Sequence, residues 1–262
     1  MNKPKPSLLQ LDSGHYIAYN KFTPTETDSP VGIIFMGGFI SDMEGSKALF
    51  LEKFAKEKNI PFIRFDYFGH GKSSGKFTDG TIGRWKEDAL KVIDELTDAP
   101  QILIGSSLGG WISLLSAIER PEKIAALIGI APAPDFTEEL IWDVLKPEEK
   151  EILQKEGMYV LPSEYCDDPE EDDYPITMNL IEEARSHMLL GNPININCPV
   201  RLIHGKKDKD VPYQTSNRIK EKLTSKNVEI TFVEDGDHRM SDEKNLEIIK
   251  TVLENTLKIC KK

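Results

Sequence analysis

The stretch from Gln101 to Trp111 constrains the fold more than any other part of the chain. Residues 101–104 are mostly apolar and have the length of a short buried strand. Residues 105–109, GSSLG, come next and fit the pattern G-x-S-x-G, and the apolar segment after them predicts a helix. We therefore predict a strand, a sharp turn centred on Ser107, and a buried helix.

The turn predicted at Ser107 has chemical consequences. A strained backbone there lifts the serine hydroxyl off the end of the sheet. Glycine is required at Gly105 and Gly109, because a Cβ at either place would collide with the neighbouring strand or helix. The N-terminus of the following helix directs free N–H groups, that of Leu108 among them, at any negative oxygen formed beside the serine.

The rest of the chain alternates between strand-like and helix-like segments. After an opening hairpin around residues 12–14, apolar runs predict strands at 31–36, 61–66, 124–130, 199–204 and 228–233. Amphipathic segments between them predict helices near 46–58, 85–96, 213–223 and 242–259. Such alternation is typical of a parallel sheet covered by helices on both faces, so we expect an α/β fold.

The alternation breaks between residues 135 and 198. Three short helices are predicted there, around 141–145, 147–156 and 175–190, and an acidic run lies between the last two. We expect residues 1–134 and 199–262 to form the core and residues 135–198 a helical lid that covers the serine. The acidic run from Glu164 to Asp173 is typical of a solvated face, and it lacks the spacing of a calcium-binding loop.

One loop suggests a rival function. Gly71-Lys72-Ser73 ends like a phosphate-binding loop, but that motif requires glycine where this chain has Asp66. The polar residues that follow also do not begin a helix. We therefore predict no nucleotide site, and we expect His70 to be a loop residue.

A serine hydroxyl requires a general base, and the base requires an acid that fixes its tautomer. In enzymes with this elbow the order along the chain is serine, acid, histidine. His238 alone lies in the loop after the last predicted strand, so we predict it as the base. Asp208 and Asp210 compete for the role of acid, and we favour Asp208 because Asp210 adjoins the start of the next helix.

A second loop joins this candidate site. Gly37-Gly38-Phe39 follows a predicted strand directly, and paired glycines let the chain swing an amide toward a substrate. We predict that the backbone N–H groups of Phe39 and Leu108 form the oxyanion hole.

These features resemble the α/β-hydrolase fold superfamily across nearly the whole chain and, more narrowly, its α/β-hydrolase domain protein ten group. The resemblance lies in residues 42–48, 63–67, 101–111, 120–123, 197–199 and 237–240. The group's motif H-G-x-x-D-x-x-V-P falls on His204, Gly205, Asp208, Val211 and Pro212, which supports Asp208 as the acid. Gly37-Gly38-Phe39 departs from the Pro-Gly-Tyr that is usual in the group.

The resemblance implies an eight-stranded, mostly parallel sheet and a serine esterase or thioesterase. Expected substrates are small esters or thioesters and S-acylated proteins, cleaved through an acyl-enzyme on Ser107 without metal or organic cofactor. A non-catalytic ligand-binding protein on the same scaffold remains the alternative, since a fold does not determine a function.

Composition restricts partners and location. The 262 residues carry a formal net charge of −11, which argues against nucleic acid and anionic membranes as partners. No apolar run is long enough to span a bilayer, and three widely spaced cysteines suggest neither disulfides nor a metal site. The N-terminus lacks an apolar targeting segment, so we expect a cytoplasmic, bacterial member of the group. The sequence leaves the oligomeric state open.

Overall fold

The computed structural model describes residues 5–11, 14–161 and 174–261. Its central sheet has eight strands in the order β1-β2-β4-β3-β5-β6-β9-β10. The strands are β1 Ser7–Gln10, β2 Tyr16–Phe22, β3 Gly32–Met36, β4 Phe62–Phe65, β5 Gln101–Ser106, β6 Ile124–Ile130, β9 Val200–Gly205 and β10 Val228–Val233.

Most neighbouring strands of this sheet are parallel. Only β2 pairs antiparallel with β1 and with β4, and every other pairing in the sheet runs parallel. The inner strands β3, β4 and β5 are buried at every position, as continuous apolar runs covered on both faces should be. The predicted fold class and the opening hairpin are both confirmed.

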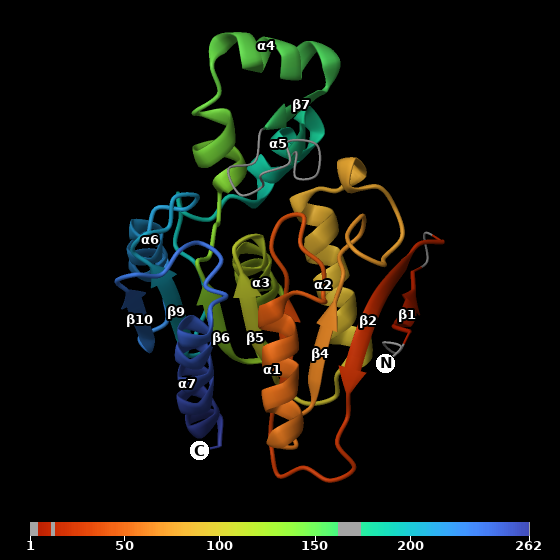
Figure 1. Ribbon diagram of the computed structural model, residues 1–262, viewed down its shortest axis with the longest axis vertical. Helices are drawn as coiled ribbons and strands as arrows, with labels where there is room; N and C mark the ends of the chain where they lie inside the picture. Colours follow the sequence, from red (N-terminus) through yellow and green to blue (C-terminus); the bar gives the residue numbers. More distant parts are fainter. Residues whose placement is uncertain (1–4, 12–13, 162–173, 262) are drawn as a thin grey trace.

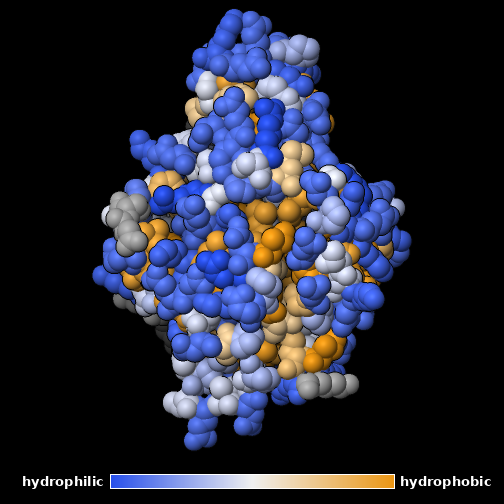
Figure 2. Space-filling model, turned by 180° about the vertical axis from the view of Figure 1, so that it is seen from behind, coloured by the Kyte–Doolittle hydropathy of each residue, from blue (hydrophilic) through white to orange (hydrophobic). Residues whose placement is uncertain are grey.

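Helices cover the sheet in two layers (Figure 1). On one face, α1 Ser46–Glu57 and α7 Glu243–Cys260 bury a cluster that includes Leu51 and Ile249. On the other, α2 Ile82–Leu96, α3 Leu108–Glu119 and α6 Gln214–Lys222 build a core around Trp85 and Trp111. Short 3₁₀ turns η1 Phe77–Asp79 and η2 Pro121–Lys123 join these elements. Seen from behind, the surface carries a concentration of apolar side chains near its centre (Figure 2).

The segment between β6 and β9 stands at one end of the molecule, above the carboxyl ends of the strands (Figure 1). We propose that residues 135–198 form the lid predicted there, and we call this segment the cap. Its described elements are the π-helix η3 Thr137–Trp142, α4 Pro147–Glu156, the hairpin β7 Met158–Leu161 with β8 Tyr174–Thr177, α5 Met178–Ala184 and the 3₁₀ turn η4 Arg185–His187.

The cap differs from the sequence prediction at two places. The helix predicted over 175–190 begins only at Met178, because the Thr177 hydroxyl accepts the Leu180 N–H and caps it there. Residues 174–177 pair with β7 instead, Pro175 lying opposite Val160. The helix predicted around 141–145 is a π-helix that ends at Trp142. The acidic run and Cys166 lie outside the described residues.

Candidate active site

The elbow predicted at Ser107 joins β5 to α3. Ser107 has φ 52° and ψ −116°, a conformation rare for a side-chain-bearing residue. Its N–H donates to the Ile130 carbonyl at 2.9 Å, and this bond ties the turn to the neighbouring strand. A Cβ on Gly105 would lie 2.2 Å from the Gly109 carbonyl oxygen, and one on Gly109 would lie 2.2 Å from the Met36 carbonyl oxygen. Both glycines are therefore required by close backbone packing, as predicted.

Three predicted residues meet at this elbow. His238 Nε2 lies 3.0 Å from Ser107 Oγ, and His238 Nδ1 lies 2.8 Å from Asp208 Oδ2. A carboxylate only accepts, so Nδ1 carries the proton and Nε2 is left to accept the serine hydroxyl proton. The Asp208 side chain is fully buried, whereas His238 keeps 15% of its surface exposed. The arrangement links a buried acid, an oriented base and an accessible hydroxyl.

The buried carboxylate of Asp208 is held from both sides. Its Oδ1 accepts the backbone N–H groups of Asp210 at 2.9 Å and Val211 at 2.8 Å. Burial alone raises the pKa of Asp208, but hydrogen bonds from His204 and His238 outweigh it and hold the pKa well below its usual range. Asp208 is therefore an anion at neutral pH.

The rival aspartate has a different setting. Asp210 is exposed, and its backbone supports Asp208 through the N–H that it donates. Asp208, Asp210 and His238 do bring three potential metal-ligand atoms within 4.8 Å of one another. A cation there would have to break the 2.8 Å bond between His238 and Asp208, so these residues suit the hydrogen-bonded arrangement better than a metal.

His204 is a contact that the sequence-based site prediction missed. It is fully buried in β9, and its Nε2 lies 3.1 Å from the same Asp208 Oδ2 that His238 approaches. Its Nδ1 lies 2.8 Å from Ser216 Oγ on α6. The position of His204 at the head of the H-G-x-x-D motif was the available signal.

The segments that carry the two predicted oxyanion donors, Leu108 and Phe39, both adjoin the elbow at Ser107. Leu108 is the first residue of α3, so its N–H has no acceptor one turn earlier within the helix. The loop after β3 packs against the elbow, since a Cβ on Gly38 would lie 3.5 Å from Ser107 Cβ. Ser41 stabilises that loop by donating its hydroxyl to the Gly38 carbonyl at 2.8 Å.

A cavity of about 590 Å³ opens beside Ser107 and His238. Its wall on the cap side is apolar, whereas its rim near His238 carries polar and charged side chains. The apolar wall comprises Phe136, Leu140, Ile141, Leu161, Tyr174 and Ile176, and the rim includes Asp42, Ser46, Lys47, Asp210, Arg239 and Ser241.

Phe39 connects the loop after β3 to the apolar wall. Its ring lies 5.5 Å from that of Phe136 and stacks on Tyr174 at 6.2 Å, so it contacts the cap at two places. Its edge-to-face contact with Phe77 at 4.9 Å extends the aromatic cluster into the core. The side chain of Phe39 therefore belongs to the cavity wall.

Lys47 on α1 is a second residue that sequence reasoning missed. Its ammonium donates to the Arg239 carbonyl and to Ser241 Oγ, so it holds the loop that carries His238. Burial lowers the pKa of Lys47 to about 8, and the nearby Asp237 carboxylate opposes that shift. No pattern in the sequence pairs this helix with that loop.

The loop that resembled a phosphate-binding loop wraps a carboxylate instead. Asp66 accepts the N–H of Lys72 at 2.8 Å and that of Met43 at 2.6 Å. A Cβ on Gly71 would lie 2.3 Å from Asp66 Oδ2, so the space a phosphate needs is filled. His70 is a buried residue of this loop, and burial lowers its pKa to about 4.

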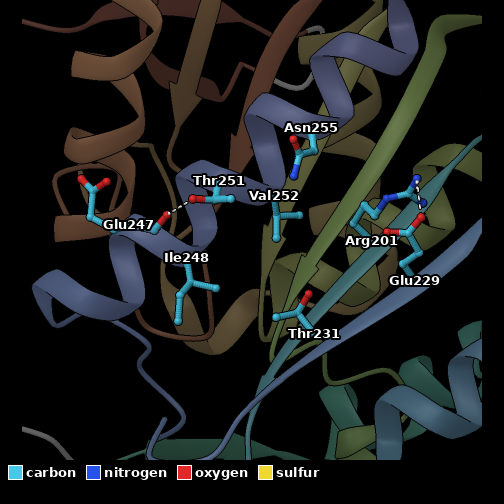
Figure 3. Close-up of a pocket in the computed structure, with 8 residues that line it drawn as sticks. All are labelled: Arg201, Glu229, Thr231, Glu247, Ile248, Thr251, Val252 and Asn255. Carbon is cyan, nitrogen blue, oxygen red and sulfur yellow. Dashed lines mark hydrogen bonds and ion pairs between the residues drawn. The ribbon is translucent and has the colours of Figure 1, made fainter.

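A second cavity, of about 380 Å³, lies between α7 and the β9–β10 edge of the sheet (Figure 3). On its sheet side, the Arg201 guanidinium on β9 lies 3.3 Å from the Glu229 carboxylate on the neighbouring β10. None of the residues around Ser107 lines this cavity.

Among the described residues, no helix is both long enough and apolar enough to cross a membrane.

The chain is similar to known proteins in sequence and in fold. A family model described as serine aminopeptidase, S33, matches residues 32–173. Palmitoyl-protein thioesterase ABHD10, mitochondrial, of Homo sapiens is 42% identical over 241 residues, which are 92% of this chain and 76% of the relative.

Solved structures extend the comparison to three dimensions. The structure of alpha/beta hydrolase domain-containing protein 10 from mouse has a TM-score of 0.88 at 38% identity and covers 97% of this chain and 99% of its own. Est1E from Butyrivibrio proteoclasticus, with ferulic acid bound, has a TM-score of 0.77 at 23% identity over 95% of this chain and 96% of its own, and it shares the fold.

Proposed function

Since the chain belongs to the α/β-hydrolase family described as serine aminopeptidase, S33, together with the ABHD10 thioesterases, we propose that it cleaves esters and thioesters through Ser107, His238 and Asp208. The observation that carries the proposal is the hydrogen-bonded line of these three side chains, with spacings of 3.0 Å and 2.8 Å. Both lie within the range that general-base catalysis requires.

The first half of the proposed reaction acylates the serine. His238 Nε2 takes the proton of Ser107 as Oγ attacks the acyl carbon, and the Asp208 carboxylate stabilises the resulting imidazolium. The N–H groups of Leu108 and Phe39 hold the negative oxygen of the tetrahedral intermediate. His238 then returns the proton to the departing alkoxide or thiolate, and the acyl group stays on Ser107.

The second half regenerates the enzyme. A water molecule gives a proton to His238 Nε2 and attacks the acyl-serine carbonyl, and the same two N–H groups hold the second oxyanion. Collapse of that intermediate releases the carboxylic acid, and His238 protonates Ser107 Oγ. Each step uses only water and the residues of this chain, so the proposed reaction requires neither metal nor organic cofactor.

The cavity supports an acyl group that is mainly apolar. The wall provided by the cap, with Phe136, Leu140 and Tyr174 among its residues, offers burial that favours hydrocarbon chains. We include S-acylated protein cysteines among the proposed substrates, because the ABHD10 relatives are named palmitoyl-protein thioesterases. The small-molecule esters that share the acyl group are the simplest surrogates.

Location and partners are part of the same proposal. The free thiols of Cys198 and Cys260 fit a reducing compartment such as the cytoplasm. The named relatives are mitochondrial, so cell fractionation with an antibody to this chain is the deciding measurement. The strong negative charge gives no support to a nucleic-acid partner.

The test is hydrolysis of p-nitrophenyl esters from acetyl to palmitoyl and of the matching thioesters, by wild type and Ser107→Ala. We expect hydrolysis by wild type and a loss of at least about 10³-fold in the variant, because the attacking oxygen is removed. Ser106→Ala, which changes the adjacent serine, is the matched control. Full activity of Ser107→Ala contradicts the mechanism, and no labelling of wild type by a fluorophosphonate favours the non-catalytic binding protein.

A further inference from the structure

A second histidine stands behind the acid of the site. Asp208 Oδ2 lies 2.8 Å from His238 Nδ1 and 3.1 Å from His204 Nε2, so one carboxylate oxygen serves two imidazoles. We infer that His204 is a positioning residue for the reaction. Its imidazole holds the Asp208 carboxylate in place, and the negative charge of Asp208 Oδ2 is divided between His204 and His238. This inference rests on the proposed function.

The contacts of His204 determine where its proton lies. Its Nε2 faces two acceptors, Asp208 Oδ2 and the Val211 carbonyl oxygen, both at 3.1 Å. A nitrogen between two acceptors must be the N–H donor. Its Nδ1 then remains to meet Ser216 Oγ at 2.8 Å, and the serine hydroxyl donates to it when the ring is neutral. Ser216 therefore selects the tautomer that donates to Asp208.

Secondary structure holds this arrangement rigidly. His204 lies in β9 with a strand on each side, because β9 pairs with β6 and β10. The side chain of His204 and that of Asp208 are both fully buried, and so is Ser216 on α6. Burial in this place keeps water from replacing the imidazole donor, so each hydrogen bond has its full effect on the carboxylate.

The consequence for the reaction concerns the strength of Asp208 as an acceptor. A carboxylate oxygen that already accepts one N–H holds less negative charge for a second. His204 thus weakens the electrostatic attraction between the Asp208 carboxylate and the His238 imidazolium. It also keeps the carboxylate oriented toward His238 Nδ1. Removal of the His204 donor should favour the protonated form of His238. It should also leave the Asp208 carboxylate, and with it the His238 ring, less precisely oriented.

The experiment measures kcat, KM and their pH dependence for His204→Leu, His204→Gln and Ser216→Ala with a p-nitrophenyl ester. Glutamine keeps an N–H donor near the place of Nε2, whereas leucine removes it. Thr256→Val is the control, because Thr256 is also a fully buried hydroxyl residue but lies on α7, where it donates to the Val252 carbonyl. Melting temperature is recorded for every variant.

We expect His204→Leu to lower kcat by about 10- to 100-fold with little change in KM, as a misaligned catalytic group does. The acid limb of its kcat/KM profile should move to higher pH, and the downfield proton resonance of the His238–Asp208 hydrogen bond should shift. His204→Gln should restore most of kcat, and Ser216→Ala should fall between the two. The charged groups around His238, which all variants retain, are Asp42, Lys47, Asp208, Asp210, Asp237 and Arg239.

Three results overturn the inference while wild type remains active. The first is a folded His204→Leu with wild-type kcat and an unmoved acid limb. The second is an equal loss in His204→Leu and His204→Gln, and the third is an unchanged downfield resonance in both. Where His204→Leu does not fold, Ser216→Ala and His204→Gln carry the same comparison. Absence of hydrolysis by wild type contradicts the proposed function instead.

Discussion

Two aspartates that are two residues apart in the chain have opposite environments. Asp208 is buried and accepts four hydrogen bonds through its two oxygens, whereas Asp210 is exposed. In the sequence the two compete for one role, and Asp208 is favoured because Asp210 adjoins the start of the next helix. The motif H-G-x-x-D also favoured Asp208, and in the structure Asp208 Oδ2 lies 2.8 Å from His238 Nδ1.

The pair provides a matched test at this scale. We expect Asp208→Asn to lower kcat by about 10³- to 10⁴-fold, since an amide donor at Oδ2 would reverse the tautomer of His238. Asp210→Asn should stay within about threefold of wild type, because the substitution keeps the backbone N–H that Asp210 donates to the Asp208 carboxylate. Initial rates on one p-nitrophenyl ester decide this, and equal losses in the two variants would refute the assignment of Asp208.

At the scale of elements, the elbow depends on close contact between α3 and the end of β3. The Cβ that Gly109 lacks would overlap the Met36 carbonyl oxygen, which belongs to the strand leading into the loop that carries Phe39. A change in this contact should therefore move Ser107 and the proposed oxyanion donor Phe39 together.

Gly109→Ala tests that contact. Alanine favours a helix by about 1 kcal/mol over glycine, but overpacking here should outweigh this and lower the free energy of unfolding by about 1–3 kcal/mol. Gly191→Ala is the control, because nothing lies within 4 Å of the added Cβ. Urea denaturation measures both, and a Gly109→Ala variant as stable as wild type would show that the backbone contact yields easily.

One side chain joins the first residue of the cap to a segment near the other end of the cap. Asp135 is fully buried at φ 62°, and its two carboxylate oxygens accept the N–H groups of Leu189 at 2.7 Å and Leu190 at 2.8 Å. The first residue of the cap therefore holds the segment after η4, through which the chain runs on toward β9.

Asp135→Asn should loosen this tie, because one of the two N–H groups then faces an amide donor. We expect KM for decanoyl and longer esters to rise by about 5- to 10-fold, the size of one lost hydrogen bond, with acetyl esters changed less than threefold. Asp143→Asn, at an exposed position of the cap, is the comparison variant. Equal changes for short and long esters would argue against a role in acyl selection.

Sequence reasoning succeeded for elements with a strong local signal. The strands β3, β5 and β6 are continuous apolar runs, and α4 begins at Pro147 as its proline predicts. The hairpin of β7 and β8 escaped prediction, because its strands have four residues each and pair across a long gap in the chain. The contacts of Lys47 escaped because they join α1 to the loop after β10, which only tertiary packing brings together. His204 is different, since it lies four residues from Asp208 and the H-G-x-x-D motif marks its position.

At the scale of the whole molecule, buried carboxylates make stability depend on pH. Burial raises the pKa of Asp88 on α2 to about 7, although the Phe68 N–H partly offsets the shift. Burial also raises the pKa values of Asp66 and Asp135. The folded protein keeps protons on these groups that the unfolded chain loses near pH 4.

The sign of the effect follows for Asp88. Its raised pKa contributes stability that is fully present below about pH 4 and is lost as pH rises through about 7. We expect the free energy of unfolding to fall by on the order of 4 kcal/mol from this group over that range. Asp88→Asn should flatten the curve, whereas Asp94→Asn on the same helix should not, because Asp94 lies near the surface with a lowered pKa. Urea midpoints at several pH values test this, and an unflattened curve in Asp88→Asn would contradict it.

The cap occupies a single stretch of the chain between β6 and β9, whereas Ser107, Asp208 and His238 come from loops outside it. The proposed catalytic residues and the cap residues that line the cavity are therefore encoded by separate segments of the gene. Drift or recombination within the codons for 135–198 can alter which acyl groups are accepted while the hydrolytic apparatus is inherited intact. Proteins with this arrangement can therefore evolve a new substrate preference through changes confined to one segment of the chain.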